Sequence, residues 1–214
     1  MTDKLTVYKL ALSHLEERTI SGLSDSGSPR RVLDEFWDTT ARYCLERKLW
    51  NFAYRAVQME ASTSIDPAFG YSFAFRIPDD WLRTRVLSAA PGFNPPLLQY
   101  VEESGYWYAN VAPLFVQYNS FHENYGMNLG EWPELFTDFV SLRLAEKACR
   151  RITGKGDLLE GSTGLIRRAE KACRLASGML AMNDPVGFLP TGAWVRSRRG
   201  FGSVRGDEPG GGLL

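Results

Sequence analysis

The chain has 214 residues, of which 44% are hydrophobic and 13% aromatic, so it is long enough and apolar enough to bury a core. Its 25 basic and 25 acidic residues give a formal net charge of zero, which argues against a dedicated nucleic-acid-binding protein, because such proteins usually carry a basic excess. No stretch approaches the ~18 apolar residues of a membrane span and the N-terminus has no uninterrupted apolar run, so neither membrane contact nor a signal peptide is expected.

The N-terminal part of the chain predicts two helices. Apolar residues recur at helical spacing from Leu5 to Leu15, and the turn-rich segment SGLSDSGSP ends this first helix. Pro29 suits the first turn of a second helix, because the N–H that proline lacks would have no partner there. The second helix is long, carries an apolar stripe and is expected to end near Phe52.

The hydrophobic period changes between about Tyr54 and Leu129. Side chains alternate in YSFAFRI, at residues 71–77, and in YWYANV, at residues 106–111, and prolines and glycines interrupt the region repeatedly. Ser104-Gly105, which follows two glutamates, predicts a hairpin turn. We expect a small antiparallel sheet of about four strands, inserted between two pairs of helices.

Helical spacing returns after Pro133. The third predicted helix ends at Gly154 and Gly156, and its buried stripe consists of Leu135, Phe136, Phe139, Val140, Leu144 and Ala148. A last helix, from about Leu158 to Met182, has a face rich in small residues. The predicted fold class is therefore mainly α. A helical bundle is built from residues 1–53 and 130–184, and a small antiparallel β subdomain is inserted at residues 54–129.

The remaining residues, 185–214, predict an extended, flexible C-terminal arm. The segment is glycine-rich and basic, and it cannot bury enough surface to fold alone. It nevertheless carries isolated large apolar residues, which is typical of an arm that becomes ordered on a partner. The residues predicted to bind that partner are apolar anchors and the basic run between them: Phe188, Trp194, Arg196, Arg198, Arg199 and Phe201. Contact of the basic run with nucleic acid stays open as an alternative.

No pattern in the sequence indicates catalysis. His14 and His122 are the only histidines, and neither has a cysteine or histidine at metal-ligand spacing. Asp79 and Asp80 are adjacent, so on a strand they would point in opposite directions, and a turn explains them better than an acid/base pair. We expect no enzyme activity, no metal and no cofactor. The three cysteines are expected to be buried free thiols, as suits a reducing cytosol: Cys44, Cys149 and Cys173.

The order of these segments resembles the tail tubular, or head-to-tail adaptor, proteins of tailed bacteriophages. The resemblance covers about residues 8 to 200. The segments that carry it are, in chain order, ALSHLEERTISGLSDSGSPRRVLDEFWD, LERKLWNFAYR, GYSFAFRIPDDWLR, EWPELFTDFVSLRLAEKAC, MLAMND and GAWVRSRRG.

The resemblance implies a structural virion protein. Proteins of this family form a homo-oligomeric ring, usually dodecameric, between the portal protein and the tail or nozzle protein, and DNA passes through its lumen. By this resemblance the helical bundle forms the ring body, the sheet insertion reaches toward the tail and the arm embraces the portal. The location would be the neck of the virion, after assembly in the host cytoplasm. A neutral or acidic lumen is expected, because tight phosphate contacts would hinder the DNA. The alternative is a DNA-binding regulatory protein that uses the basic arm.

Overall fold

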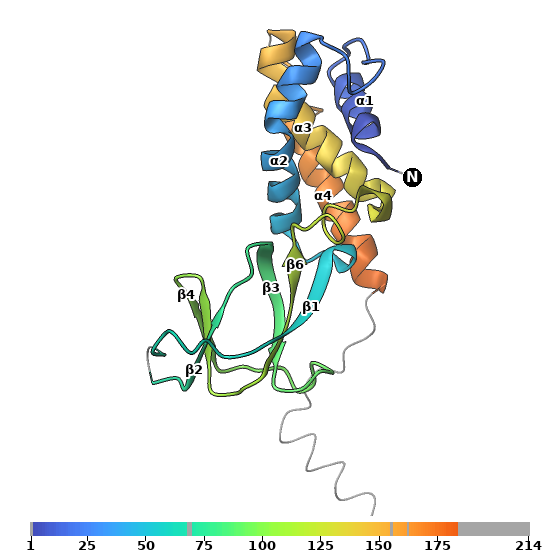
Figure 1. Cartoon of the computed structure of the whole chain (residues 1–214). Coiled ribbons are helices and arrows are strands. Elements are labelled where there is room, and N and C mark those ends of the chain that lie inside the picture. The colour runs from blue at the N-terminus through green and yellow to red at the C-terminus, as the bar shows by residue number, and fades with distance from the viewer. Residues whose placement is uncertain (1, 68–69, 155, 162, 184–214) are drawn as a thin grey trace, which may run out of the picture. The chain divides into compact units, whose positions relative to one another are not determined.

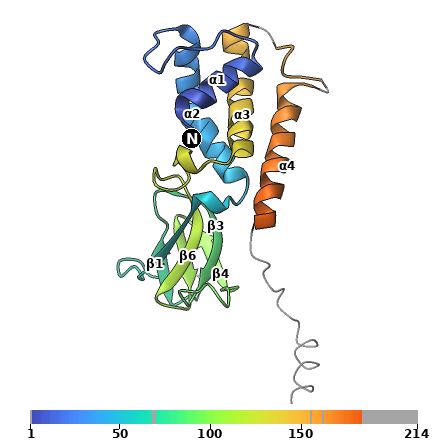
Figure 2. The ribbon, with the colours of Figure 1, turned by 90° about the vertical axis from the view of Figure 1, so that its right-hand side faces the viewer.

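The fold of the chain is given by a computed structural model, which describes residues 2–67, 70–154, 156–161 and 163–183. The predicted arm at residues 185–214 lies outside the described residues. Within them, four α-helices and two three-stranded antiparallel sheets form a mixed α/β fold (Figures 1 and 2). The prediction of a mainly α fold with a small β subdomain is therefore wrong, since helices make up 42% and strands 19% of the structure.

Helix α1 spans Lys4–His14, α2 Ser28–Arg47, α3 Glu134–Thr153 and α4 Leu165–Asn183. Both α1 and α2 pack against α3. The N-terminus of α1 is capped by Asp3, whose carboxylate accepts a hydrogen bond from the backbone N–H of Thr6 at 2.6 Å. Helix α3 ends where Gly154 adopts a left-handed conformation, with φ of 68°. None of the described helices is long and apolar enough to cross a membrane.

Helix α4 begins at Leu165 and not at about Leu158, as its apolar spacing predicted. Two glycines account for the difference. Gly161 has a φ of 98°, which other residues rarely adopt, and a side chain at Gly164 would lie 2.6 Å from the carbonyl oxygens of Leu159 and Glu160. The chain therefore turns sharply before the helix starts.

The helices share a core in which aromatic rings meet edge to face or stack. The ring of Trp132 lies 5.0 Å from that of Phe136 and 6.1 Å from that of Trp37, and Phe136 also contacts Trp50 at 4.8 Å. The predicted stripe of α3 faces this core, with Leu135 half-buried and the others buried. The three cysteines are buried and free, as predicted.

The six strands form two sheets. Strands β1 (Tyr54–Met59), β6 (Leu114–Ser120) and β3 (Trp81–Ser88) make up the first sheet in that order. Strands β2 (Phe73–Arg76), β5 (Tyr106–Ala109) and β4 (Tyr100–Glu103) make up the second. All neighbouring strands are antiparallel.

The predicted hairpin turn joins β4 to β5. Ser104 and Gly105 have φ of 51° and 82°, the positive values that a tight two-residue hairpin requires. Beside this turn Glu102 accepts hydrogen bonds from Trp107 Nε1 and Thr84 Oγ1, each at 2.9 Å, so it links the second sheet to the first. Residues from both sheets form a core of their own: Phe75, Leu87, Trp107, Ala109, Leu114, Val116 and Tyr118. This separate core is why the β part is not a small insertion.

A short 3₁₀ helix, η1 (Asn51–Ala53), leads from the end of α2 into β1. At this junction the buried Asn119 of β6 donates to the carbonyl oxygens of Leu45 at 2.9 Å and Lys48 at 2.7 Å. Its own oxygen accepts from the backbone N–H of Trp50 at 3.3 Å. Carbonyls at a helix C-terminus have no partner within the helix. The first sheet therefore satisfies the end of α2 and holds it in place.

Candidate functional site

The residues that the sequence assigns to partner binding are all in the arm, outside the described residues: Phe188, Trp194, Arg196, Arg198, Arg199 and Phe201. The candidates within the described ranges are the polar clusters around Asp80 and His14, and the outer face of α4.

The Asp79-Asp80 pair lies in a turn, as predicted, and its two carboxylates have different surroundings. The Asp79 side chain is 95% exposed, whereas that of Asp80 is 16% exposed. Asp80 accepts hydrogen bonds from Arg55 at 2.9 Å, from the hydroxyl of Tyr118 at 3.1 Å and from Ser120. Burial alone would raise the pKa of Asp80, but these hydrogen bonds outweigh it and lower the pKa. Asp80 is thus a fixed carboxylate that joins the turn to β1 and β6.

His14 and Ser141 form the one contact in the described residues that resembles a catalytic pair. Ser141 Oγ lies 3.3 Å from His14 Nε2, and Arg168 lies 3.0 Å from His14 Nδ1. A guanidinium can only donate hydrogen bonds, so Nδ1 must be the acceptor and the neutral ring carries its proton on Nε2. That proton faces Ser141, which itself donates to the carbonyl oxygen of Asp138 at 2.9 Å. The ring cannot accept the serine proton, so the pair lacks the polarity of a nucleophile and its base.

The same geometry predicts a pH-dependent contact between α1 and α4. Burial, and then the charge of Arg168, lower the pKa of His14 below its ordinary value of 6.5, while Asp138 opposes the shift. The folded state therefore binds fewer protons than the unfolded state, and stability is expected to fall as the pH drops below 6.5. His14 and Arg168 line a cavity of about 270 Å³, and the other charged groups that line it among the described residues are Glu16, Asp157 and Glu160.

Urea unfolding at pH 7.5 and pH 5.5 checks this prediction, with His14→Gln as the comparison variant. The loss of stability between the two pH values should be smaller in the variant, because glutamine does not titrate. An unchanged difference would show that other groups cause the pH dependence. His122→Gln is the matched control, since His122 is exposed and its Nδ1 accepts only from the backbone N–H of Asn124 at 3.1 Å.

His122 lies in no metal site within the ranges that the structure describes. Among these residues no group of three or more His, Cys, Asp or Glu side chains could hold a metal ion.

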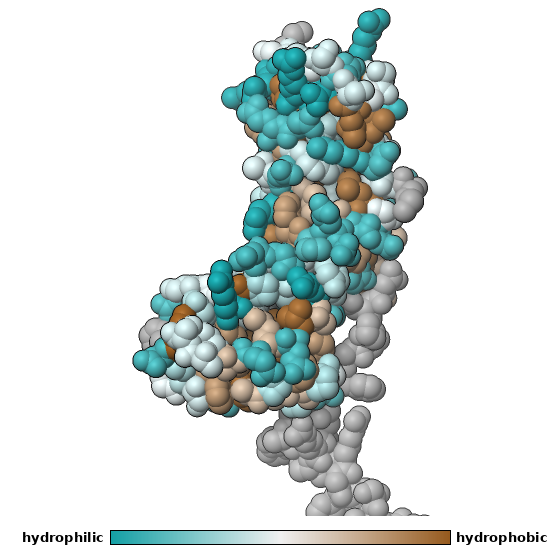
Figure 3. All heavy atoms as spheres, in the orientation of Figure 1, coloured by the Kyte–Doolittle hydropathy of each residue, from teal (hydrophilic) through white to brown (hydrophobic). Residues whose placement is uncertain are grey.

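Helix α4 has two apolar faces. Its inner face is buried in the helical core and consists of Leu165, Ala169, Cys173 and Ala176. Leu175 and Met179, spaced one turn apart, are 51% and 56% exposed and form what we call the outer ridge. Figure 3 shows that apolar residues also lie among hydrophilic ones elsewhere on the surface, which is ordinary for a folded protein. The outer ridge differs because its residues form a row on one helix.

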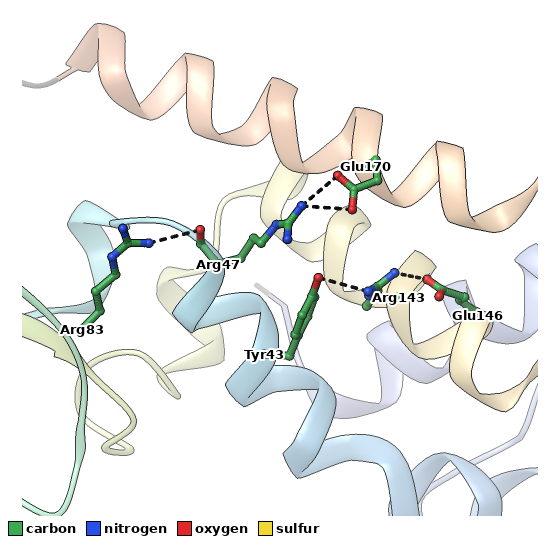
Figure 4. A network of polar contacts seen from close by, with 6 residues as sticks. All are labelled: Tyr43, Arg47, Arg83, Arg143, Glu146 and Glu170. Carbon is green, nitrogen blue, oxygen red and sulfur yellow. Dashed lines mark hydrogen bonds and ion pairs between the residues drawn. The ribbon is translucent and has the colours of Figure 1, made fainter.

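Ion pairs and hydrogen bonds connect α4 and the sheets to the helical core (Figure 4). Arg47, in the last turn of α2, donates to both oxygens of Glu170 in α4 at 3.2 Å. Arg83 of β3 points at the end of α2 and donates to the carbonyl oxygen of Arg47 at 3.4 Å. Arg143 of α3 contacts the hydroxyl of Tyr43 at 3.0 Å and pairs with Glu146.

Two grooves with basic linings border α4. The first, of about 550 Å³, lies between α4, the end of α2 and β3, and the second, of about 390 Å³, follows the N-terminal half of α4. Both are lined by Arg174, so they adjoin. Their charged lining residues among those described are all basic and form what we call the basic surface: Arg47, Lys48, Arg83, Arg167, Arg168, Lys171 and Arg174.

Neither the basic surface nor the outer ridge was predicted from the sequence. The spacing of Arg167, Lys171 and Arg174 was a signal for one basic face of a helix, whereas Arg83 comes from a strand that was not predicted.

Comparison with models of known protein families gives no match, and comparison with curated proteins gives none either. The resemblance to phage adaptors therefore rests on the sequence segments that carry it.

Proposed function

We propose that this chain is a structural virion protein, the head-to-tail adaptor of a tailed bacteriophage. Copies of it would form a ring, dodecameric by the resemblance, that joins the portal to the tail or nozzle and lets DNA pass. The observation that carries the proposal is the outer ridge of α4, since an adaptor subunit must bury apolar surface against its neighbours.

The outer ridge supports assembly because of where its residues lie. Leu175 and Met179 lie on the flank of α4 beside its buried face, and they are not among the residues that pack against the helical core. Exposed apolar rows rimmed by polar residues mark protein contacts more often than single exposed leucines do. Lys171 and Arg174 supply such a polar rim. A closed ring of identical contacts would cover the ridge in every subunit.

The proposal also assigns portal binding to the arm at residues 185–214. Trp194 and Phe201 would enter apolar pockets of the portal, and Arg196, Arg198 and Arg199 would pair with its carboxylates or carbonyl oxygens. This part of the proposal rests on the sequence alone.

Negative-stain electron microscopy tests the assembly step, with the purified full chain mixed with portal rings of the phage that encodes it. The unaltered chain should add a ring of density to one end of the portal. The double variant Leu175→Glu, Met179→Glu should leave the portal bare, because two charges would have to be buried in each subunit contact.

Leu98→Glu is the matched control, since Leu98 is 85% exposed, lies far from α4 in sequence and should tolerate the charge. A portal that stays bare with the unaltered chain would contradict the adaptor proposal. A ring that forms equally well with the double variant would show that the outer ridge is not the subunit contact.

A further inference from the structure

The basic surface departs from the neutral charge balance of the whole chain. Its members come from α2 and the residue that follows it, from β3 and from α4. Of the described carboxylates only Glu170 pairs with one of them, Arg47. Arg168 contacts His14, which is neutral for the reasons given above. The remaining positive charge has no acidic partner within the described parts of the chain.

The row along α4 is the most regular part of this surface. Arg167, Lys171 and Arg174 follow one another at spacings of four and three residues, so they share one helix face. All three are exposed, and within the described residues their side chains make no hydrogen bond or ion pair. At 1.5 Å per residue the row covers about 10.5 Å, over which a B-form duplex carries roughly six phosphates.

We propose that the basic surface binds the phosphodiester backbone of duplex DNA, without reading its sequence. Guanidinium groups, which predominate on this surface, suit phosphate oxygens because they donate in a fixed bidentate geometry. The regularly spaced phosphates of the duplex also match the regularly spaced basic side chains of α4. The binding does not require the ring, and it is distinct from the DNA contact that the sequence left open for the arm.

An acidic protein is the competing ligand, and the lining of the grooves argues against it. Protein contacts obtain most of their affinity from buried anchors, chiefly tryptophan, tyrosine and arginine, and of these the described linings offer arginine alone. The described lining residues of the two grooves include no aromatic side chain, and Leu49 is their one large apolar residue. Leu175 and Met179 of the adjoining outer ridge line neither groove.

Contacts of this kind are weak and salt-dependent, so they are compatible with DNA that moves. Each phosphate contact releases bound counterions, and affinity falls steeply between about 50 and 200 mM salt. Backbone contacts also let a protein slide along a duplex. An adaptor that carried this surface toward its lumen would depart from the neutral or acidic lining that the resemblance implies, but it would hold the DNA loosely without stopping its passage.

Fluorescence anisotropy with a short labelled duplex, measured on the full chain over this salt range, tests the proposal. The triple variant Arg167→Gln, Lys171→Gln, Arg174→Gln should bind about tenfold more weakly, and its plot of log affinity against log salt should be flatter by about 2.7. Its thermal unfolding should be unchanged, because these side chains are exposed and hold no described contact.

The matched control carries Lys9→Gln, Arg18→Gln and Arg31→Gln, which remove three exposed basic residues elsewhere. It should keep both the affinity and the salt slope, and an equal loss in the control would overturn the proposal. A second comparison variant has Arg196, Arg198 and Arg199 changed to Gln, and its binding to the duplex is measured in the same way. If these arm substitutions abolish binding by themselves, the arm is the DNA site and the proposal fails.

Poly-L-glutamate separates phosphate from carboxylate recognition. It should displace the duplex poorly at equal charge concentration. Displacement as efficient as that by unlabelled DNA would show that the surface recognises acidic protein. Absence of any duplex binding by the unaltered chain at about 50 mM salt would also overturn the proposal.

Discussion

Replacing Trp50 with alanine is expected to destabilise the protein by about 3–5 kcal/mol, the usual cost of removing a large aromatic side chain from a core. Trp50 is fully buried, and its ring contacts those of Phe136 at 4.8 Å and Phe52 at 6.2 Å. Its indole N–H also donates to the carbonyl oxygen of Cys44 at 2.9 Å. The variant would therefore leave a cavity at the junction of α2 and the first sheet, and the Cys44 carbonyl oxygen would lose its indole donor.

Urea unfolding followed by circular dichroism measures this change. Trp50→Phe is the matched variant, because it keeps an aromatic ring in the core and removes the hydrogen bond. The lost hydrogen bond should add about 1–2 kcal/mol to the small cost of exchanging one aromatic ring for another. The total loss of stability should stay clearly below that of Trp50→Ala. A cost below about 1 kcal/mol for Trp50→Ala would show that this junction does not unfold with the core.

The helices could be predicted because their signals are local. The spacing of apolar residues identified α1 and α2, and on α3 it also gave the buried face, on which Phe139 and Leu144 lie. Gly154 ended α3 as a left-handed C-terminal glycine should. The predicted start of α4 was wrong because the apolar spacing begins at Leu158, whereas Gly161 and Gly164 turn the backbone before the helix begins.

The fold class was wrong because β3 and β6 do not show a clean alternation of apolar and polar residues. Strand β6 is central in its sheet and is buried or half-buried along its whole length, so both of its faces are covered. Strand β3 has register shifts between Trp81 and Arg83 and between Thr84 and Val86, which interrupt the period of two. The hairpin at Ser104-Gly105 was predicted because its turn residues require positive φ.

The parts of the candidate sites that join distant segments could not be predicted, since no local pattern marks such contacts. Asn119 and Arg83 meet the end of α2 across at least 36 residues of sequence. The basic surface likewise combines α4 with α2 and β3. The arm residues, by contrast, were predicted from composition, which indicates that a segment needs a partner but not what the partner is.

Replacing Asp80 with alanine is expected to cost about 3 kcal/mol, because it leaves a partly buried guanidinium and two hydroxyl groups without their acceptor. Arg55 and Tyr118 would both lose a partner, and the turn would lose its attachment to β6 at Ser120.

Asp79→Ala is the matched control, since this neighbouring carboxylate is almost fully exposed and lies 3.6 Å from Arg76, which is 74% exposed, so its loss should change stability little. The pKa of Asp80 is lowered in the folded state, so its stabilising effect is present above the ordinary value of 3.8 and is lost as the pH falls through the lower folded value. Acid titration of unfolding should therefore show a smaller loss of stability in Asp80→Ala than in Asp79→Ala. Equal acid sensitivity of the two variants would mean that other carboxylates control the low-pH stability. Equal stability at neutral pH would show that the hydrogen bonds around Asp80 contribute nothing to the fold.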